Sequence, residues 1–185
     1  KAISSEWKNI NDQIWLIGSN KSEKTIAASS YLEYFHGEIT GRPPKIDLQD
    51  EKLCQSFLRK AILRSFVVSS HDISDGGLAI ALAECCILSD LGATIVLPKN
   101  FNRDDNLLFA EGGSRIIFSI AKKKEAEWLD YLKKIQIYSQ SSLYVNKIGY
   151  VSTETLNIKI QDKKICNIRV EELTEKFNNS ISGHF

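Results

Sequence analysis

Short apolar runs that end at glycine or polar residues recur along the chain and predict the strands of a β-sheet. We expect strands at 12–18, 66–68, 93–97, 114–120, 143–148, 156–160 and 165–170. The polar turn at 161–163 separates the last two, which are therefore predicted to form a hairpin.

Apolar residues at helical spacing lie between these strands. After Asp47, one helix face is formed by Leu53, Cys54, Phe57, Leu58, Ala61 and Ile62. Asp47 can cap this helix, and Asp50 and Glu51 oppose the positive end of its dipole. A second amphipathic helix is traced by Leu78, Leu82, Cys85, Cys86 and Ser89.

Further helices are expected at 27–35, ending at His36 and Gly37, and at 104–110, 122–134 and 171–177. The polar residues 178–185 should form a tail that frays. Hairpins mixed with strand–helix alternation indicate an α+β domain, in which helices cover a mixed β-sheet.

The balance of charge argues against two classes of partner. Twenty-four Lys and Arg face 23 Asp and Glu, and the resulting net charge of +1 is too small for a general grip on nucleic acid or anionic lipid. No apolar stretch approaches the roughly 20 residues that span a bilayer. The sequence therefore predicts no nucleic-acid partner and no membrane association.

The cysteines indicate a reducing compartment. Cys85 and Cys86 are adjacent inside a predicted helix. None of the four cysteines, which include Cys54 and Cys166, belongs to a CxxC motif or a Cys/His cluster. We therefore expect small buried thiols rather than disulfides or a zinc site, and a cytoplasmic location.

The chain contains no methionine and begins at Lys1. We interpret it as a fragment of a longer polypeptide. At 185 residues it can bury about 70% of the surface of its unfolded chain, so a single domain over residues 1–185 is expected.

The first loop whose residues could bind a ligand covers residues 69–78 (SSHDISDGGL), between a predicted strand and a predicted helix. Free amides at the helix start and paired glycines would let a phosphate or carboxylate approach, while carboxylates are donors that Mg²⁺ prefers. The same residue types also cap helices and form turns, so the loop taken by itself is more often structural. The candidate site residues are His71, Asp72, Ser74, Asp75, Gly76 and Gly77, with Asp72 as the candidate magnesium ligand.

The second loop covers residues 109–115 (FAEGGSR) and leads into a strand. The guanidinium of Arg115 could form two parallel hydrogen bonds to a phosphate, and the carboxylate of Glu111 could hold a metal ion. A tight turn with an ordinary surface ion pair remains the alternative. Its candidate residues are Glu111, Gly112, Gly113, Ser114 and Arg115.

Beyond these physical arguments, the segment from His71 to Glu84 (HDISDGGLAIALAE) resembles the HDVS(D/E)GGLAVALAE motif of the large synthetase subunit of phosphoribosylformylglycinamidine synthase. Residues 31–48 resemble the SEYL…HG…GRLPK(V/I)DL stretch of that family, and residues 108–115 resemble its LFSES-type motif. Trp15 to Gly18 also match a family strand that closes on Leu-Gly. The resemblance covers nearly the whole chain.

This resemblance implies the C-terminal domain fold of the aminoimidazole ribonucleotide synthetase superfamily, here from the second half of a duplicated enzyme. It implies an ATP- and Mg²⁺-dependent carbon–nitrogen ligase of purine biosynthesis that converts formylglycinamide ribonucleotide to the amidine. Its partners would be the parent's N-terminal domains and first half, and a glutaminase that supplies ammonia.

The resemblance places most ATP and Mg²⁺ ligands and the catalytic histidine on the absent N-terminal domains. No residue of this chain, His71 included, is therefore expected to be catalytic, and the isolated domain should be inactive. The family's Ser-Pro or Ser-Gln after the glutamate is replaced by Gly112-Gly113, so the first loop is the stronger candidate for the interdomain cleft. Two alternatives remain: a structural half-domain that binds nothing, and another ATP-using member of the same superfamily.

Overall fold

A computed structural model describes residues 2–19, 25–99, 103–138 and 142–182. Within these ranges seven strands form one sheet in the order β2-β4-β1-β5-β3-β6-β7. Neighbouring strands are antiparallel except for the parallel pair β3 and β6, so the predicted mixed sheet is confirmed. The strands are β1 (Gln13–Ser19), β2 (Val67–Asp72), β3 (Gly92–Leu97), β4 (Arg115–Ile120), β5 (Leu143–Ser152), β6 (Thr155–Ile160) and β7 (Lys163–Arg169).

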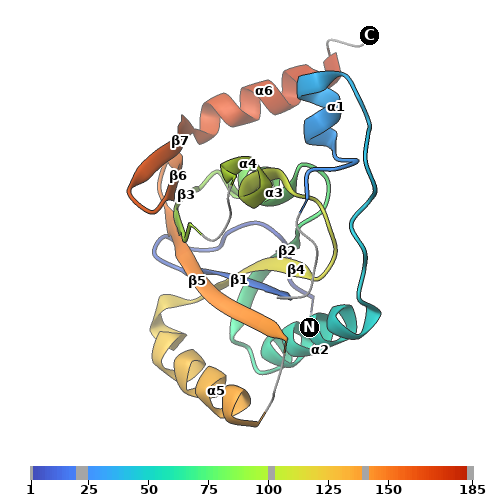
Figure 1. Cartoon of the computed structure of the whole chain (residues 1–185). Coiled ribbons are helices and arrows are strands. Elements are labelled where there is room, and N and C mark those ends of the chain that lie inside the picture. Colours follow the sequence, from blue (N-terminus) through green and yellow to red (C-terminus); the bar gives the residue numbers. More distant parts are fainter. Residues whose placement is uncertain (1, 20–24, 100–102, 139–141, 183–185) are drawn as a thin grey trace.

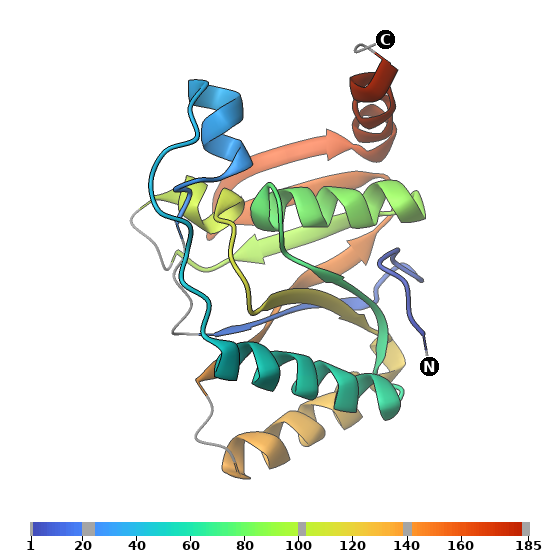
Figure 2. The same ribbon diagram turned by 90° about the vertical axis from the view of Figure 1, so that its right-hand side faces the viewer.

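Helices cover both faces of the sheet (Figures 1 and 2). They are α1 (Ser30–His36), α2 (Leu48–Leu63), α3 (Gly77–Ser89), α4 (Asp104–Phe109), α5 (Glu125–Tyr138) and α6 (Val170–Ser182), with a 3-10 turn over Lys122–Lys124. Helices α2 and α5 lie on one side, while α3, α4 and α6 lie on the other. This arrangement confirms the α+β class.

Strand β1 lies between two hydrophobic cores. Every residue of β1 is buried, because successive side chains of a strand point to opposite faces and helices cover both faces of this sheet. Ile14 and Leu16 join the core beneath α3. Trp15 and Ile17 join the core beneath α2 and α5. A short apolar run with no alternation therefore marks a strand covered on both faces.

The start of α2 follows the predicted capping. Asp47 is the N-cap, and its Oδ1 accepts hydrogen bonds from the backbone amides of Gln49 and Asp50 at 2.9 and 3.1 Å. Asp50 does more than oppose the helix dipole, because it is buried and its carboxylate accepts hydrogen bonds from Ser19 and Ser142.

Removing this cap should destabilise the chain without changing its fold. Asp47→Ala leaves two first-turn amides without their acceptor, and we expect a loss of about 1 kcal/mol in the free energy of unfolding. Urea unfolding measures the change, with Asp47→Asn as the control because asparagine is an equally good N-cap. Equal losses in both variants would contradict the capping role.

Several predicted boundaries are wrong by a few residues. Strand β2 continues to Asp72, because pairing of His71 and Asp72 with Ile117 and Ile116 satisfies backbone groups that local propensity does not predict. Strand β5 likewise continues to Ser152 along β3. Helix α1 begins at Ser30, three residues later than expected.

The C-terminal helix is also longer than predicted. Helix α6 runs through Ser182, so the predicted helix end at residue 177 is wrong by five residues. Fraying of the tail stays a prediction, and its residues 183–185 lie outside the described residues. The predicted place of Leu53 on the buried face of α2 is wrong, because its side chain is 47% exposed.

The four cysteines are free, as predicted. Cys54, Cys85 and Cys86 are buried, and Cys166 is half-buried. Burial raises the pKa of Cys54 and of Cys86 to about 12, which suppresses the thiolate form at neutral pH. These thiols behave as small hydrophobic side chains.

Candidate functional site

The two predicted loops lie together on one groove. Its volume is about 480 Å³, and it is bordered by the end of β2, the segment between α4 and β4, and helix α2. The lining residues are Glu51, Gln55, Asp72, Ile73, Ser74, Asp75, Glu111, Gly112, Gly113, Ser114, Arg115 and Ile116. The groove therefore brings together segments that are about 40 and 60 residues apart in sequence.

Only part of the first loop reaches the groove. Asp72, Ser74 and Asp75 line it, while His71, Gly76 and Gly77 do not. The His71 ring lies between Asp72 and α3: its Nδ1 is 2.6 Å from the Asp72 carbonyl oxygen, and its Nε2 is 3.1 Å from a Glu84 carboxylate oxygen. Both ring nitrogens thus face acceptors within the chain, which gives His71 a structural position.

The paired glycines have structural reasons of their own. Gly76 and Gly77 both adopt positive φ, +73° and +71°. A Cβ on Gly77 would lie 2.7 Å from backbone atoms of Phe109 and 2.8 Å from the Leu108 carbonyl oxygen. Gly77 therefore allows the start of α3 to approach the end of α4, and the ligand role of the two glycines stays a prediction.

Glu111 joins three segments of the site. Its Oε1 accepts hydrogen bonds from the backbone amide of Gly76 at 2.7 Å and from that of Ser30, at the start of α1, at 3.0 Å. The amide at the start of α3 was predicted to bind a ligand anion, and the chain's own carboxylate takes it instead. The loop residues that line the groove are Asp72, Ser74 and Asp75, and their ligand role stays a prediction.

Helix α2 supplies two groove residues that were not among the candidates. Glu51 Oε2 accepts a hydrogen bond from Ser114 Oγ at 2.8 Å, and Gln55 Nε2 donates to Glu51 Oε1 at 2.8 Å. The sequence offered only the helix-dipole interpretation for Glu51. Its distance from Ser114 along the chain hid the contact.

Arg115 is a buried cation beside the groove. It is 5% exposed, and its guanidinium donates a hydrogen bond to the Ala110 carbonyl oxygen. In the described part of the chain no carboxylate pairs with it, so the expected alternative of a surface ion pair is wrong. Burial lowers the pKa of the guanidinium, yet arginine stays protonated near neutral pH. An uncompensated buried cation favours an anionic ligand.

The residues that the structure describes do not by themselves make a complete magnesium site. Among the described residues, no three His, Cys, Asp or Glu side chains come close enough to hold a metal ion. The Asp72 side chain is largely exposed and could be one ligand. When Mg²⁺ also binds substrate phosphates, it takes only one or two carboxylates from the protein. The remaining ligands of a magnesium ion would have to come from a bound phosphate, from water or from another domain.

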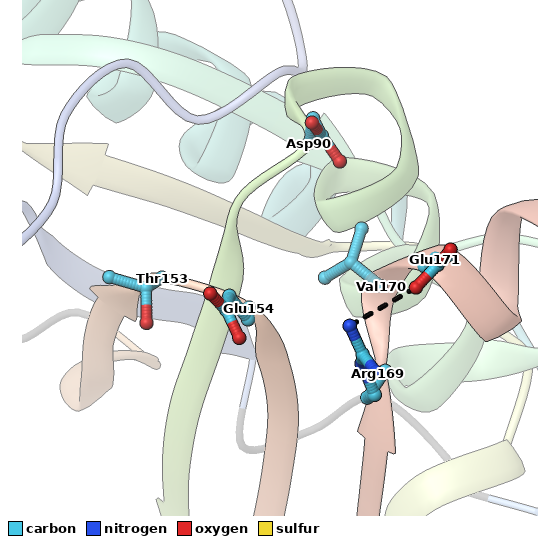
Figure 3. A pocket seen from close by; sticks show the side chains of 6 residues that line it. All are labelled: Asp90, Thr153, Glu154, Arg169, Val170 and Glu171. Carbon is cyan, nitrogen blue, oxygen red and sulfur yellow. Dashed lines mark ion pairs between the residues drawn. The ribbon is translucent and has the colours of Figure 1, made fainter.

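A second hollow, of about 390 Å³, has a different character (Figure 3). Its lining consists of Asp90, Thr153, Glu154, Arg169, Val170 and Glu171. Its one cation, Arg169, pairs with Glu171 at 3.1 Å, so an entering anion would meet mainly carboxylates. This hollow provides control positions rather than a candidate anion site.

The clasp made by Glu111 can be tested through stability. We expect Glu111→Ala to lower the free energy of unfolding by about 2 kcal/mol, because two amides lose a charged acceptor. Glu111→Gln keeps a side-chain oxygen and should lose about half as much. Urea unfolding measures both, and Glu171→Ala, on an exposed pair, is the control. If Glu111→Ala matches that control, Glu111 does not hold the segments together.

No helix in the described residues is long and apolar enough to cross a membrane.

Comparison with known proteins agrees with the fold. Residues 9–154 match the family described as AIR synthase related protein, C-terminal domain. The whole chain is 83% identical to part of phosphoribosylformylglycinamidine synthase subunit PurL from Prochlorococcus marinus (strain MIT 9312), and it spans 24% of that relative's length.

Two solved structures share the architecture. Thermotoga maritima PurL complexed with FGAR superposes with a TM-score of 0.71 over 93% of this chain and 29% of its own. The same protein complexed with ATP gives 0.68 over 93% and 27%. The identities of 17% and 16% make these matches evidence for the fold.

Proposed function

Because this chain belongs to the family of AIR synthase related protein C-terminal domains, we propose that it forms one wall of the nucleotide or substrate site of a phosphoribosylformylglycinamidine synthase. The chain spans about a quarter of the length of its curated relatives, so the activity belongs to a longer parent protein. Residues 1–185 would be one domain of that parent, inactive by itself.

The observation that carries the proposal is the groove with its buried cation. Arg115 lies among lining residues from both loops, without a carboxylate partner in the described residues. The exposed carboxylate of Asp72 borders the same groove. A phosphate that carries Mg²⁺ would satisfy both charges, because the phosphate oxygens suit the guanidinium and the cation suits the carboxylate.

The proposed parent reaction is the ATP-dependent conversion of formylglycinamide ribonucleotide to its amidine, in purine biosynthesis. Phosphorylation of the amide oxygen makes it a good leaving group, and ammonia from a glutaminase then displaces it. Such chemistry depends on positioning and charge neutralisation. This chain would contribute the Arg115 cation and the Asp72 carboxylate, while the parent's other domains provide the groups that react.

The cell compartment follows from the same proposal. Four unpaired cysteines fit a reducing cytoplasm, where such a synthase would meet its substrates and a glutaminase partner.

One observation favours a second candidate function, a structural half-domain. The Gly76 amide, which is predicted to bind a ligand, donates its hydrogen bond to Glu111 instead. A domain that kept its fold while losing its ligand could retain such an internal bond.

The test is synthase activity of the full-length parent. We expect Asp72→Asn to reduce the ammonia-dependent amidation rate by about tenfold or more, because it removes a charge from the groove without changing the size of the side chain. Thermal unfolding should not change, since the Asp72 side chain is exposed.

The matched control is Glu154→Gln, which removes the same charge from the second hollow. It should leave the rate within about twofold of the wild type. If Asp72→Asn keeps full activity and full nucleotide binding, the groove is not part of the site and the structural half-domain is correct.

A further inference from the structure

An unusually exposed apolar surface lies between α1 and α2. Five large apolar side chains within fifteen residues face solvent: Tyr34, Phe35, Ile39, Ile46 and Leu48, exposed by 84, 63, 66, 61 and 77%. We call these five residues the strap face. Single exposed apolar residues are ordinary, but such a concentration marks a contact surface.

Helix α1 holds two of its three aromatic residues, Tyr34 and Phe35, outward. None of its seven residues is buried, and a helix of this length is not stable alone in water. It is anchored from within, since the Tyr31 ring stacks on Phe109 at 4.7 Å between ring centroids and the Ser30 amide donates to Glu111. The outward Tyr34 ring meets Phe35 at 5.1 Å and remains largely in solvent.

The strap face continues to the groove. After α1, the chain runs along one edge of the molecule to the start of α2 (Figure 2). Near its end, the Ile46 side chain lies 3.8 Å from where a Cβ on Gly113 would be. Glu51, one turn into α2, is itself a groove residue. A partner seated on the strap face would therefore also border the groove.

We propose that the strap face is where the remainder of the parent synthase packs on this chain, through a largely apolar surface of its own. The proposal rests on the proposed function, because it needs the chain to be part of a longer synthase. A relative 83% identical over the whole chain has about three-quarters of its length outside the matched region. Surface that is buried against that remainder is exposed in this chain alone.

The makeup of the strap face fits a permanent contact better than a transient one. Its three aliphatic and two aromatic side chains are of the kind found at the centres of obligate interfaces, and the exposed charged residues between them, Glu38, Arg42 and Lys45, are of the kind found at interface rims. Docking there would bring the remaining domains beside Asp72 and Arg115, where the groove lacks ligands for a cation. The contact would complete the site as well as cover apolar surface.

Hydroxyl-radical footprinting of the wild-type, full-length parent tests this without substitution. Oxidation of Tyr34 is measured by mass spectrometry in the native and urea-unfolded protein. We expect oxidation in the native protein to be slower by about fivefold or more, as for a tyrosine buried in an interface. A rate close to that of the unfolded protein would overturn the proposal.

A matched cysteine pair on α2 gives a second measurement. Leu48 and Leu63 lie at opposite ends of this helix and are similarly exposed in the chain, at 77 and 68%. In the full-length parent, Leu48→Cys should react with a polar maleimide about tenfold more slowly than Leu63→Cys, because only the first would be covered. Equal rates would overturn the proposal.

A second copy of the parent is the other possible occupant. Protection that disappears on dilution, together with a doubled mass by light scattering, would assign the strap face to a dimer and overturn the proposal. Neither labelling experiment needs substrate. Protected strap residues with a fully active Asp72→Asn variant would remove the proposed groove function and leave the docking surface standing.

Discussion

Replacing Gly77 with alanine should lower the free energy of unfolding by about 4 kcal/mol, because it adds backbone strain to a steric clash. The residue has φ of +71°, and its new Cβ would meet backbone atoms of Phe109 at 2.7 Å. Backbone atoms cannot rotate away as the end of a flexible side chain can. The clash would push α4 and the groove segment after it away from α3.

Gly37→Ala is the matched control for this prediction. Gly37 has nearly the same φ, +69°, but nothing lies within 4 Å of its Cβ position. This variant should lose only about 1 kcal/mol, the cost of the left-handed conformation alone. Urea unfolding of both variants separates the two causes, and similar losses would show that the approach of α3 to α4 does not require glycine.

Trp128→Ala should be similarly damaging, with an expected loss of about 3–5 kcal/mol. Trp128 is fully buried at the centre of the core beneath α2 and α5. Five rings surround it at centroid distances of 5.6 to 6.0 Å, those of Trp15, Phe57, Phe66, Phe118 and Tyr131. Alanine would leave a cavity that these rings cannot fill together.

Two comparisons isolate the packing contribution of Trp128. Trp128→Phe keeps an aromatic ring and removes an indole N–H that has no hydrogen-bond partner in the described structure, so it should cost less than half as much. Leu129→Ala, at a 41% exposed neighbour, should cost below about 1 kcal/mol. Urea unfolding gives all three values, and a small loss for Trp128→Ala would contradict its central role in the core.

Sequence patterns predicted the elements of this fold better than their ends. The helix that starts after Asp47 and the strand that contains Trp15 follow from capping and apolar runs, which are local properties. The extension of β2 through His71 and Asp72 depends on pairing with β4, more than forty residues away. Local propensity does not contain that information.

The residues of the site could likewise be predicted from the sequence, but the contacts between them could not. Asp72 and Arg115 could be selected from their residue types and their position beside predicted turns. The bond from Glu111 to the Gly76 amide and the bond from Ser114 to Glu51 could not, since each joins segments brought together only by the sheet. The second loop was ranked lower, yet all five of its candidate residues line the groove.

The most direct measurement is hydrogen–deuterium exchange of the full-length synthase, with and without FGAR, ATP and Mg²⁺. If the groove forms a wall of the ligand site, the loop amides of Gly112, Gly113 and Ser114 should exchange about tenfold more slowly when the ligands are present. The amides near Thr153 and Glu154, beside the second hollow, should not change. Unchanged exchange at 112–114, while other parts of the synthase become protected, would contradict the proposed site.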